Sequence, residues 1–104
     1  GQVMGSAVQL SAASSQMIIA EGLESAFSVM QVTGVSTWAA LSTSGLKGLV
    51  LPSMVQRITI ACDNDPAGLN AAKDAAEKWR KEGREVSLAI PPINKDFNDL
   101  LIGR

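Results

Sequence analysis

Short apolar runs recur along the chain, and most are followed by a segment in which apolar residues return every three or four positions. Apolar runs rich in branched residues are typical of strands buried in a parallel sheet. They predict strands at residues 17–20, 35–41, 57–62 and 85–90. A shorter patch at 7–10 predicts an edge strand.

The segment after the first strand has helical spacing. Apolar residues there predict one buried face of a helix, made by Leu23, Ala26, Phe27 and Met30. Gly34 follows the last of them and is a suitable residue to end the helix. Residues 42–48 are rich in Ser and Gly and predict a loop or short helix, and residues 96–102 predict a short capped helix.

A longer helix is predicted from 66 to 83. Pro66 is favoured at a first helical position, and Asp65 before it is a good cap. The apolar stripe of this helix is expected to contain Leu69, Ala72, Ala76 and Trp79. On the solvent side, the i,i+4 spacing predicts two ion pairs, Asp74–Lys78 and Glu77–Lys81.

Alternation of strands and helices predicts the fold class. It indicates an α/β domain with about four mainly parallel strands flanked by helices, and an extra N-terminal edge strand. We assign residues 17–104 to this domain and 1–16 to an edge segment or linker from a longer parent. Residues 25–46 are uncharged but interrupted by polar residues, so we expect no membrane span.

Composition limits the chemistry. The 104 residues include no His and no Tyr, which excludes Ser-His-Asp triads, imidazole metal ligands and a phenolic nucleophile from this chain. A lone Cys62 cannot form an internal disulfide and fits a reducing cytoplasm. Any catalysis must therefore use carboxylates, hydroxyls, Lys, the thiol or a bound metal.

Charge is unevenly distributed. The net charge is −1, and residues 1–56 contain only three charged side chains, Glu21, Glu24 and Lys47. Because the carboxyl ends of parallel strands meet at one edge of a sheet, Glu21 and Asp63 are expected to lie at the same ligand-binding edge. Asp65 stands two residues after Asp63.

A third acidic site follows the last strand, with Asp96 and Asp99. Carboxylates gathered in one crevice repel one another unless a cation neutralises them. Oxygen ligands without His or Cys favour Mg²⁺, Mn²⁺ or Ca²⁺. Such a site suits phosphoryl or nucleotidyl transfer or phosphodiester cleavage.

Simpler interpretations exist for single residues. Asp65 can be a helix cap, Asp96 and Asp99 can cap the last helix, and Glu24 fits a supporting or solvated role better than a ligand. Cys62 is expected to pack in the core. A basic group on the long helix and just after it fits a solvated face better than a phosphate contact, and it comprises Lys78, Arg80, Lys81 and Arg84.

At these residues the sequence resembles the Toprim domain of primases, topoisomerases, OLD-family nucleases and RecR-type repair proteins. Residues 19–26 (Ile-Ala-Glu-Gly-Leu-Glu-Ser-Ala) resemble its glutamate motif, and residues 60–68 resemble its Asp-x-Asp motif with the following Ala-Gly. Residues 95–101 (Lys-Asp-Phe-Asn-Asp-Leu-Leu) resemble a further acidic motif of primases. Together with residues 38–42, these details are similar to phage- and plasmid-type primases and primase-helicases.

The resemblance implies a compact Rossmann-like fold and a primase that makes primers on single-stranded DNA from nucleoside triphosphates. It implies that Glu21 is a general acid/base or a metal ligand and that Asp63 and Asp65 coordinate Mg²⁺ or Mn²⁺. Asp96 would be a further acidic ligand, with Glu24, Asp99 and Lys95 as accessory residues. An upstream zinc-binding domain and a downstream helicase are the expected partners.

One position departs from the motif of replicative bacterial primases. They usually carry an Asp four residues after the motif glutamate, where this chain has Ser25, with Glu24 one position earlier. Three other functions remain open: a Toprim-type nuclease, a HAD-type phosphatase with its own Asp-x-Asp, and a non-catalytic module that binds nucleic acid or protein. The HAD motif has Thr or Val two residues after its second Asp, where this chain has Ala67.

Overall fold

The computed structural model describes residues 7–90. Helices and strands alternate along this part of the chain: β1 (Ala7–Gln9), β2 (Gln16–Glu21), α1 (Leu23–Thr33), β3 (Ser36–Ala40), α2 (Thr43–Gly48), β4 (Arg57–Ala61), α3 (Pro66–Lys81) and β5 (Glu85–Ala89). The helix expected at 96–102 lies outside the described residues. So do three of the predicted site residues, Lys95, Asp96 and Asp99.

The strands form one mixed sheet in the order β1-β3-β2-β4-β5. β2, β3, β4 and β5 are parallel, and β1 joins the edge beside β3 in the antiparallel direction. In the centre, Ile19 of β2 lies level with Trp38 of β3 on one side and Ile60 of β4 on the other. The predicted fold class, including the extra edge strand, is confirmed.

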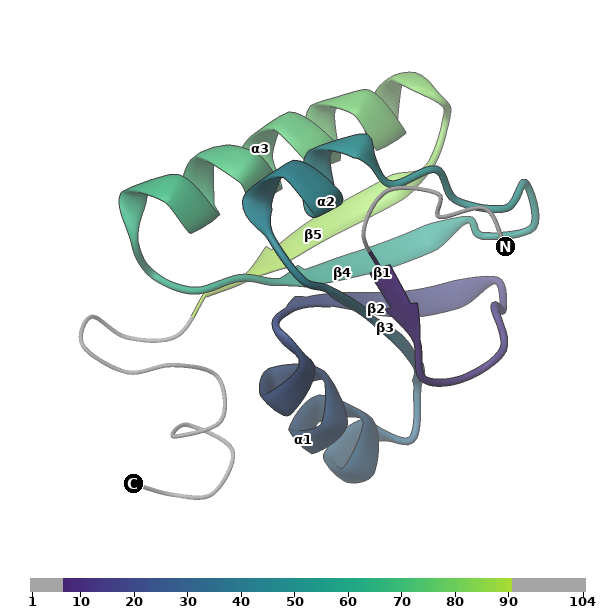
Figure 1. The fold of residues 1–104 in the computed structure, drawn as a ribbon. Coiled ribbons are helices and arrows are strands. Elements are labelled where there is room, and N and C mark those ends of the chain that lie inside the picture. Colours follow the sequence, from purple (N-terminus) through teal and green to yellow (C-terminus); the bar gives the residue numbers. More distant parts are fainter. Residues whose placement is uncertain (1–6, 91–104) are drawn as a thin grey trace.

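Helices cover both faces of the sheet, α2 and α3 on one and α1 on the other (Figure 1). Alternate residues of β2 face the two layers. Met17 and Ile19 belong to the larger core with α2 and α3, and Ile18 and Ala20 belong to the smaller core under α1. This two-sided burial explains why the strand is apolar throughout.

The buried face of α1 differs from the expected one. Ser25, Ala26 and Val29 are buried, whereas Leu23 and Phe27 are 41% and 48% exposed. The sheet under α1 presents small residues such as Ala20 and Ala39, and small helix residues pack closely against them. Spacing defines a stripe on a helix, but the shape of the opposing surface decides which edge of that stripe is buried.

α3 begins and ends as predicted within two residues, with Asp65 as its cap and Pro66 in its first turn. The expected Glu77–Lys81 pair forms at 3.1 Å. The prediction of an Asp74–Lys78 ion pair is wrong. Asp74 lies 3.6 Å from Lys47 of α2 instead, because α2 packs alongside α3 and offers a cation from another element.

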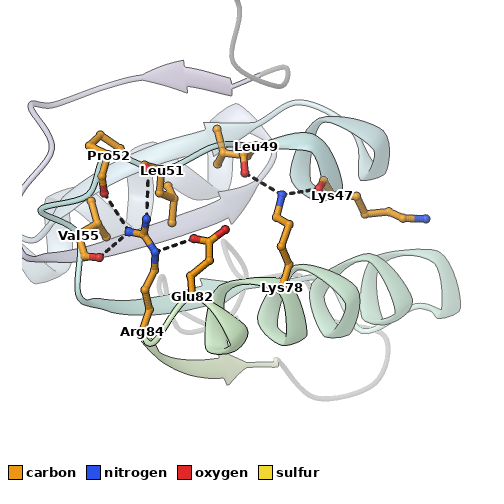
Figure 2. Close-up of polar contacts among 8 residues, drawn as sticks. All are labelled: Lys47, Leu49, Leu51, Pro52, Val55, Lys78, Glu82 and Arg84. Atoms are coloured by element: carbon orange, nitrogen blue, oxygen red, sulfur yellow. Dashed lines mark hydrogen bonds and ion pairs between the residues drawn. The ribbon is translucent and has the colours of Figure 1, made fainter.

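Lys78 and Arg84 hold the connection between α2 and β4 (Figure 2). Lys78 Nζ donates to the backbone oxygens of Lys47 at 2.7 Å and Leu49 at 2.9 Å. The Arg84 guanidinium binds three more backbone oxygens in this connection and pairs with the Glu82 carboxylate at 2.9 Å. The three oxygens belong to Leu51, Pro52 and Val55.

The basic group predicted on and after α3 is therefore not a uniformly solvated face. Lys78, Arg80 and Arg84 all donate to backbone carbonyls, Arg80 to Val86 of β5 at 2.7 Å. These side chains connect helix to loop and sheet, because the Lys ammonium and the Arg guanidinium carry several N–H donors for such carbonyls. Within residues 7–90, no helix is both long and apolar enough to cross a membrane.

Candidate functional site

The predicted acidic residues Glu21 and Asp63 lie at the same edge of the sheet. Glu21 is the last residue of β2, and Asp63 follows β4 by two residues. β2 and β4 are parallel neighbours whose last paired residues are Ala20 and Ala61. The carboxyl ends of these two adjacent strands therefore place both acids together, at the position at which open α/β sheets bind ligands.

A hydrogen bond connects the two motifs directly. Glu21 Oε1 accepts from the backbone N–H of Asp63, with 2.8 Å between oxygen and nitrogen. The bond holds the Glu21 side chain across the end of β4 rather than in solvent. Sequence spacing predicted that the motifs would be neighbours, but it carried no signal for this bond between a side chain and the backbone.

The electrostatic environment of Glu21 favours its protonated form. Partial burial raises the pKa of the Glu21 carboxyl, and the neighbouring negative charges of Asp63 and Asp65 raise it further. The Asp63 N–H opposes these effects because it stabilises the carboxylate. A carboxyl whose pKa is raised in this way can accept and return a proton nearer to neutral pH.

Asp65 has a structural role at the start of α3. Its Oδ1 accepts from the backbone N–H of Gly68 at 2.7 Å, so the interpretation of Asp65 as a helix cap is confirmed. Its side chain is exposed at the same edge as Glu21. Capping occupies one oxygen with a single N–H, and a carboxylate has several acceptor positions, so the cap role does not preclude a metal ligand.

The first turn of α3 approaches Glu21 closely at Gly68. A Cβ atom built on Gly68 would lie 2.8 Å from Glu21 Oε1, 3.1 Å from the Asp63 backbone oxygen and 3.2 Å from Asp65 Oδ1. Gly68 entered the sequence analysis only as the end of the Asp-x-Asp motif. A glycine three residues after the second candidate ligand, Asp65, was the available signal, since glycine often marks a close approach of the backbone.

The turn after Glu21 is also specific. Gly22 adopts φ +93°, a conformation that favours glycine, and its N–H donates to Ala40 at the end of β3 at 2.8 Å. The following helix then separates the next two motif residues, with Glu24 exposed and Ser25 buried. Glu24 thus lies on a different face of α1 from Ser25, the position at which replicative bacterial primases usually carry Asp.

The donors at this edge are carboxylate oxygens. Within residues 7–90, no group of three or more His, Cys, Asp or Glu side chains is arranged to hold a metal ion. Mg²⁺ commonly binds through one or two carboxylates and completes its shell with water and substrate phosphate, so the oxygens of Asp63 and Asp65 fit its chemistry. Asp96 lies outside the described residues, and its part in the ligand set stays a prediction.

Comparison with known proteins decides the family. Residues 16–104 match the family model described as the Toprim domain. The chain belongs to the Toprim family. Toprim domains generally depend on a divalent metal, and the resemblance seen in the glutamate and Asp-x-Asp motifs is confirmed.

Two solved structures share the fold of this Toprim domain. A DNA primase domain from Pseudomonas aeruginosa superposes with a TM-score of 0.64 at 24% identity, over 86% of this chain and 29% of that one. The DnaG catalytic core superposes with a TM-score of 0.60 at 19% identity, over 86% of this chain and 30% of that one. The chain thus spans about three tenths of each primase structure. No curated protein matches its sequence significantly.

Proposed function

We propose that this Toprim domain performs metal-dependent nucleotidyl transfer in a DNA primase of phage or plasmid type. The observation that carries the proposal is the assembly of Glu21, Asp63 and Asp65 at the carboxyl edge of a primase-like sheet. The phage and plasmid branch is supported by the motifs at residues 19–26 and 38–42. The motif at residues 95–101 supports the same branch.

Asp63 and Asp65 are the residues that would hold Mg²⁺ or Mn²⁺, with Asp96 as a further acidic ligand from the C-terminal segment. The metal would neutralise negative charge on the phosphates of a nucleoside triphosphate. Glu21 faces the same edge, and the charges of Asp63 and Asp65 already affect its carboxyl. Glu24, Lys95 and Asp99 are accessory in this proposal.

We propose that Glu21 accepts the proton that the attacking hydroxyl loses. Nucleotidyl transfer requires the attacking hydroxyl to lose a proton, and a carboxyl with a raised pKa is a suitable acceptor near neutral pH. The bond from the Asp63 N–H to Oε1 orients the carboxyl, so that Oε2 is the oxygen proposed to take the proton. The alternative role of Glu21 as a metal ligand would use the same oxygen.

The proposed substrates are a single-stranded DNA template and nucleoside triphosphates, bound by a longer protein of which this domain is one part. The chain corresponds to about three tenths of the two primase structures, which supports a dependence on other segments. We propose an upstream zinc-binding domain and a downstream helicase as those partners. The small net charge of the domain agrees with DNA binding that depends largely on other domains of the parent protein.

The test compares Asp63→Asn with a matched control, Asp74→Asn, in the parent protein that carries this domain. Asp74 is an exposed acid on α3 whose ion pair within residues 7–90 is with the surface lysine Lys47, so its loss should leave activity unchanged. We expect Asp63→Asn to lose at least about a hundredfold in primer synthesis, in line with the loss of a group that stabilises transition-state charge. Template binding should remain.

The same preparations are incubated with supercoiled plasmid in the presence of Mg²⁺ or Mn²⁺. Nicking that depends on Asp63, without primer synthesis, would show the nuclease alternative. DNA binding with neither reaction would show the non-catalytic alternative. Primer synthesis that survives Asp63→Asn unchanged would contradict the assignment of the site.

A further inference from the structure

We propose that Gly68 is a positioning residue: the absence of a side chain there allows the Glu21 carboxylate to lie against the first turn of α3. The importance of this position for catalysis rests on the proposed function, but the geometric claim does not. Gly68 is buried, and it belongs to the same helix that Asp65 caps. Together with the Asp63 N–H, it is thus one of two places at which the glutamate motif and the Asp-x-Asp motif come into contact.

The distances define how little space is available. A Cβ at residue 68 would lie 2.8 Å from Glu21 Oε1, a separation that carbon and oxygen do not maintain without displacement. The same oxygen accepts the Asp63 N–H, also at 2.8 Å. One oxygen therefore occupies the space that any side chain at position 68 would need, and the two cannot coexist in the present arrangement.

The displaced group is expected to be the carboxylate and not the helix. Glu21 Oε1 is at the far end of a flexible side chain, whereas the other two close atoms belong to the backbone of Asp63 and to the cap of α3. Rotating the Glu21 side chain relieves the closest contact without moving a strand. Ala is also a better helix former than Gly, so Gly68→Ala should fold.

Gly68→Ala should therefore change the site while preserving the domain. The Glu21 carboxylate moves away from α3, the bond to the Asp63 N–H is lost, and Glu21 no longer has a defined position relative to Asp65. Ordinary destabilisation would have a different signature, since it would affect amides throughout the sheet. Gly48 offers a matched control, because it lies in α2 and a Cβ there would meet nothing within 4 Å.

The experiment measures amide hydrogen exchange by NMR on the 104-residue chain without metal, for the original sequence, Gly68→Ala, Gly48→Ala and Glu21→Ala. We expect exchange at the Asp63 amide to accelerate by roughly tenfold in Gly68→Ala and in Glu21→Ala, the effect of losing one hydrogen bond. Amides of β2 and β4 should keep their rates. Gly48→Ala should leave Asp63 unchanged.

An unchanged Asp63 amide in folded Gly68→Ala would overturn the proposal. If Gly68→Ala does not fold, the double variant Glu21→Ala/Gly68→Ala decides: recovery of the fold supports a clash with Glu21, and continued unfolding contradicts it. In the parent protein, Gly68→Ala should reduce primer synthesis far less in a Glu21→Ala background than alone. Accelerated exchange with unaltered synthesis would support the positioning role and contradict the proposed function.

Discussion

Glu21 and Asp63 are separated by 42 positions in sequence and joined by a 2.8 Å hydrogen bond from the Asp63 N–H to Glu21 Oε1. The pairing of β2 with β4 brings them together, and the start of α3 closes over the pair. The bond both orients the glutamate and offsets part of the cost of burying its charge. The site is therefore sensitive to small changes at either motif.

Glu21→Gln should make the domain more stable at neutral pH. Because burial raises the pKa of Glu21 above its usual value of 4.5, the folded state binds its proton more tightly than the unfolded state does. The free energy of unfolding therefore falls as pH rises from the ordinary pKa through the raised one. Gln does not ionise, so it removes this fall in the free energy of unfolding. Its amide oxygen can still accept a hydrogen bond from the Asp63 N–H.

Urea unfolding at pH 4 and pH 7 checks this expectation. The difference in free energy of unfolding between variant and original chain should favour the variant more at pH 7 than at pH 4. A difference that does not change with pH would show that burial does not disfavour the charged form. In the parent protein the same substitution should slow primer synthesis by about 10²–10⁴-fold, the range for a general acid or base.

Two substitutions separate the capping role of Asp65 from its proposed role as a metal ligand. Asn is as good a helix cap as Asp, so Asp65→Asn should change the free energy of unfolding by less than about 0.5 kcal/mol, whereas Asp65→Ala should cost about 1 kcal/mol. Both variants should bind Mn²⁺ more weakly, as measured by paramagnetic broadening. Unweakened Mn²⁺ binding in Asp65→Asn would restrict this residue to its structural role.

Arg84 should be one of the most important charged residues for stability. Its guanidinium binds three backbone oxygens before β4, and its side chain is only 11% exposed. Arg84→Met should cost about 2–3 kcal/mol, because three backbone carbonyls, two of them in partly buried hydrogen bonds, lose a charged donor. Arg57→Met is the control: its pair with Glu85 is largely exposed and should contribute less than about 1 kcal/mol. Equal losses in chemical denaturation would contradict this ranking.

Cys62 should be unreactive in the folded domain. It is fully buried, and burial together with the charge of Glu21 raises its pKa to about 11. Since the thiolate is the nucleophile, labelling by iodoacetamide at pH 8 should be at least about a hundredfold slower in the native chain than in urea. Fast labelling of the native chain would indicate that the end of β4 opens readily.

Much of the fold followed from local pattern. The two-sided apolar run in β2, the Asp65-Pro66 helix start and the Gly34 helix end each depend on neighbouring residues, and all three were predicted. The errors concerned contacts between elements. Phe27 has helical spacing with Leu23 and Met30 but lies at an exposed edge of α1. Asp74 pairs with Lys47 of another helix rather than with Lys78.

In the candidate site too, local pattern predicted the residues but not the contacts between elements. Residue type and strand ends, together with the motifs, were enough to select Glu21, Asp63 and Asp65 and to associate them with phosphate chemistry. Sequence periodicity has no information about distances between elements, so it could not reveal the bond to the Asp63 N–H. The sequence by itself determined which acids stand where strands end. Only the tertiary structure decided that Gly68 leaves room for the Glu21 carboxylate, because the packing of β2, β4 and α3 sets that separation.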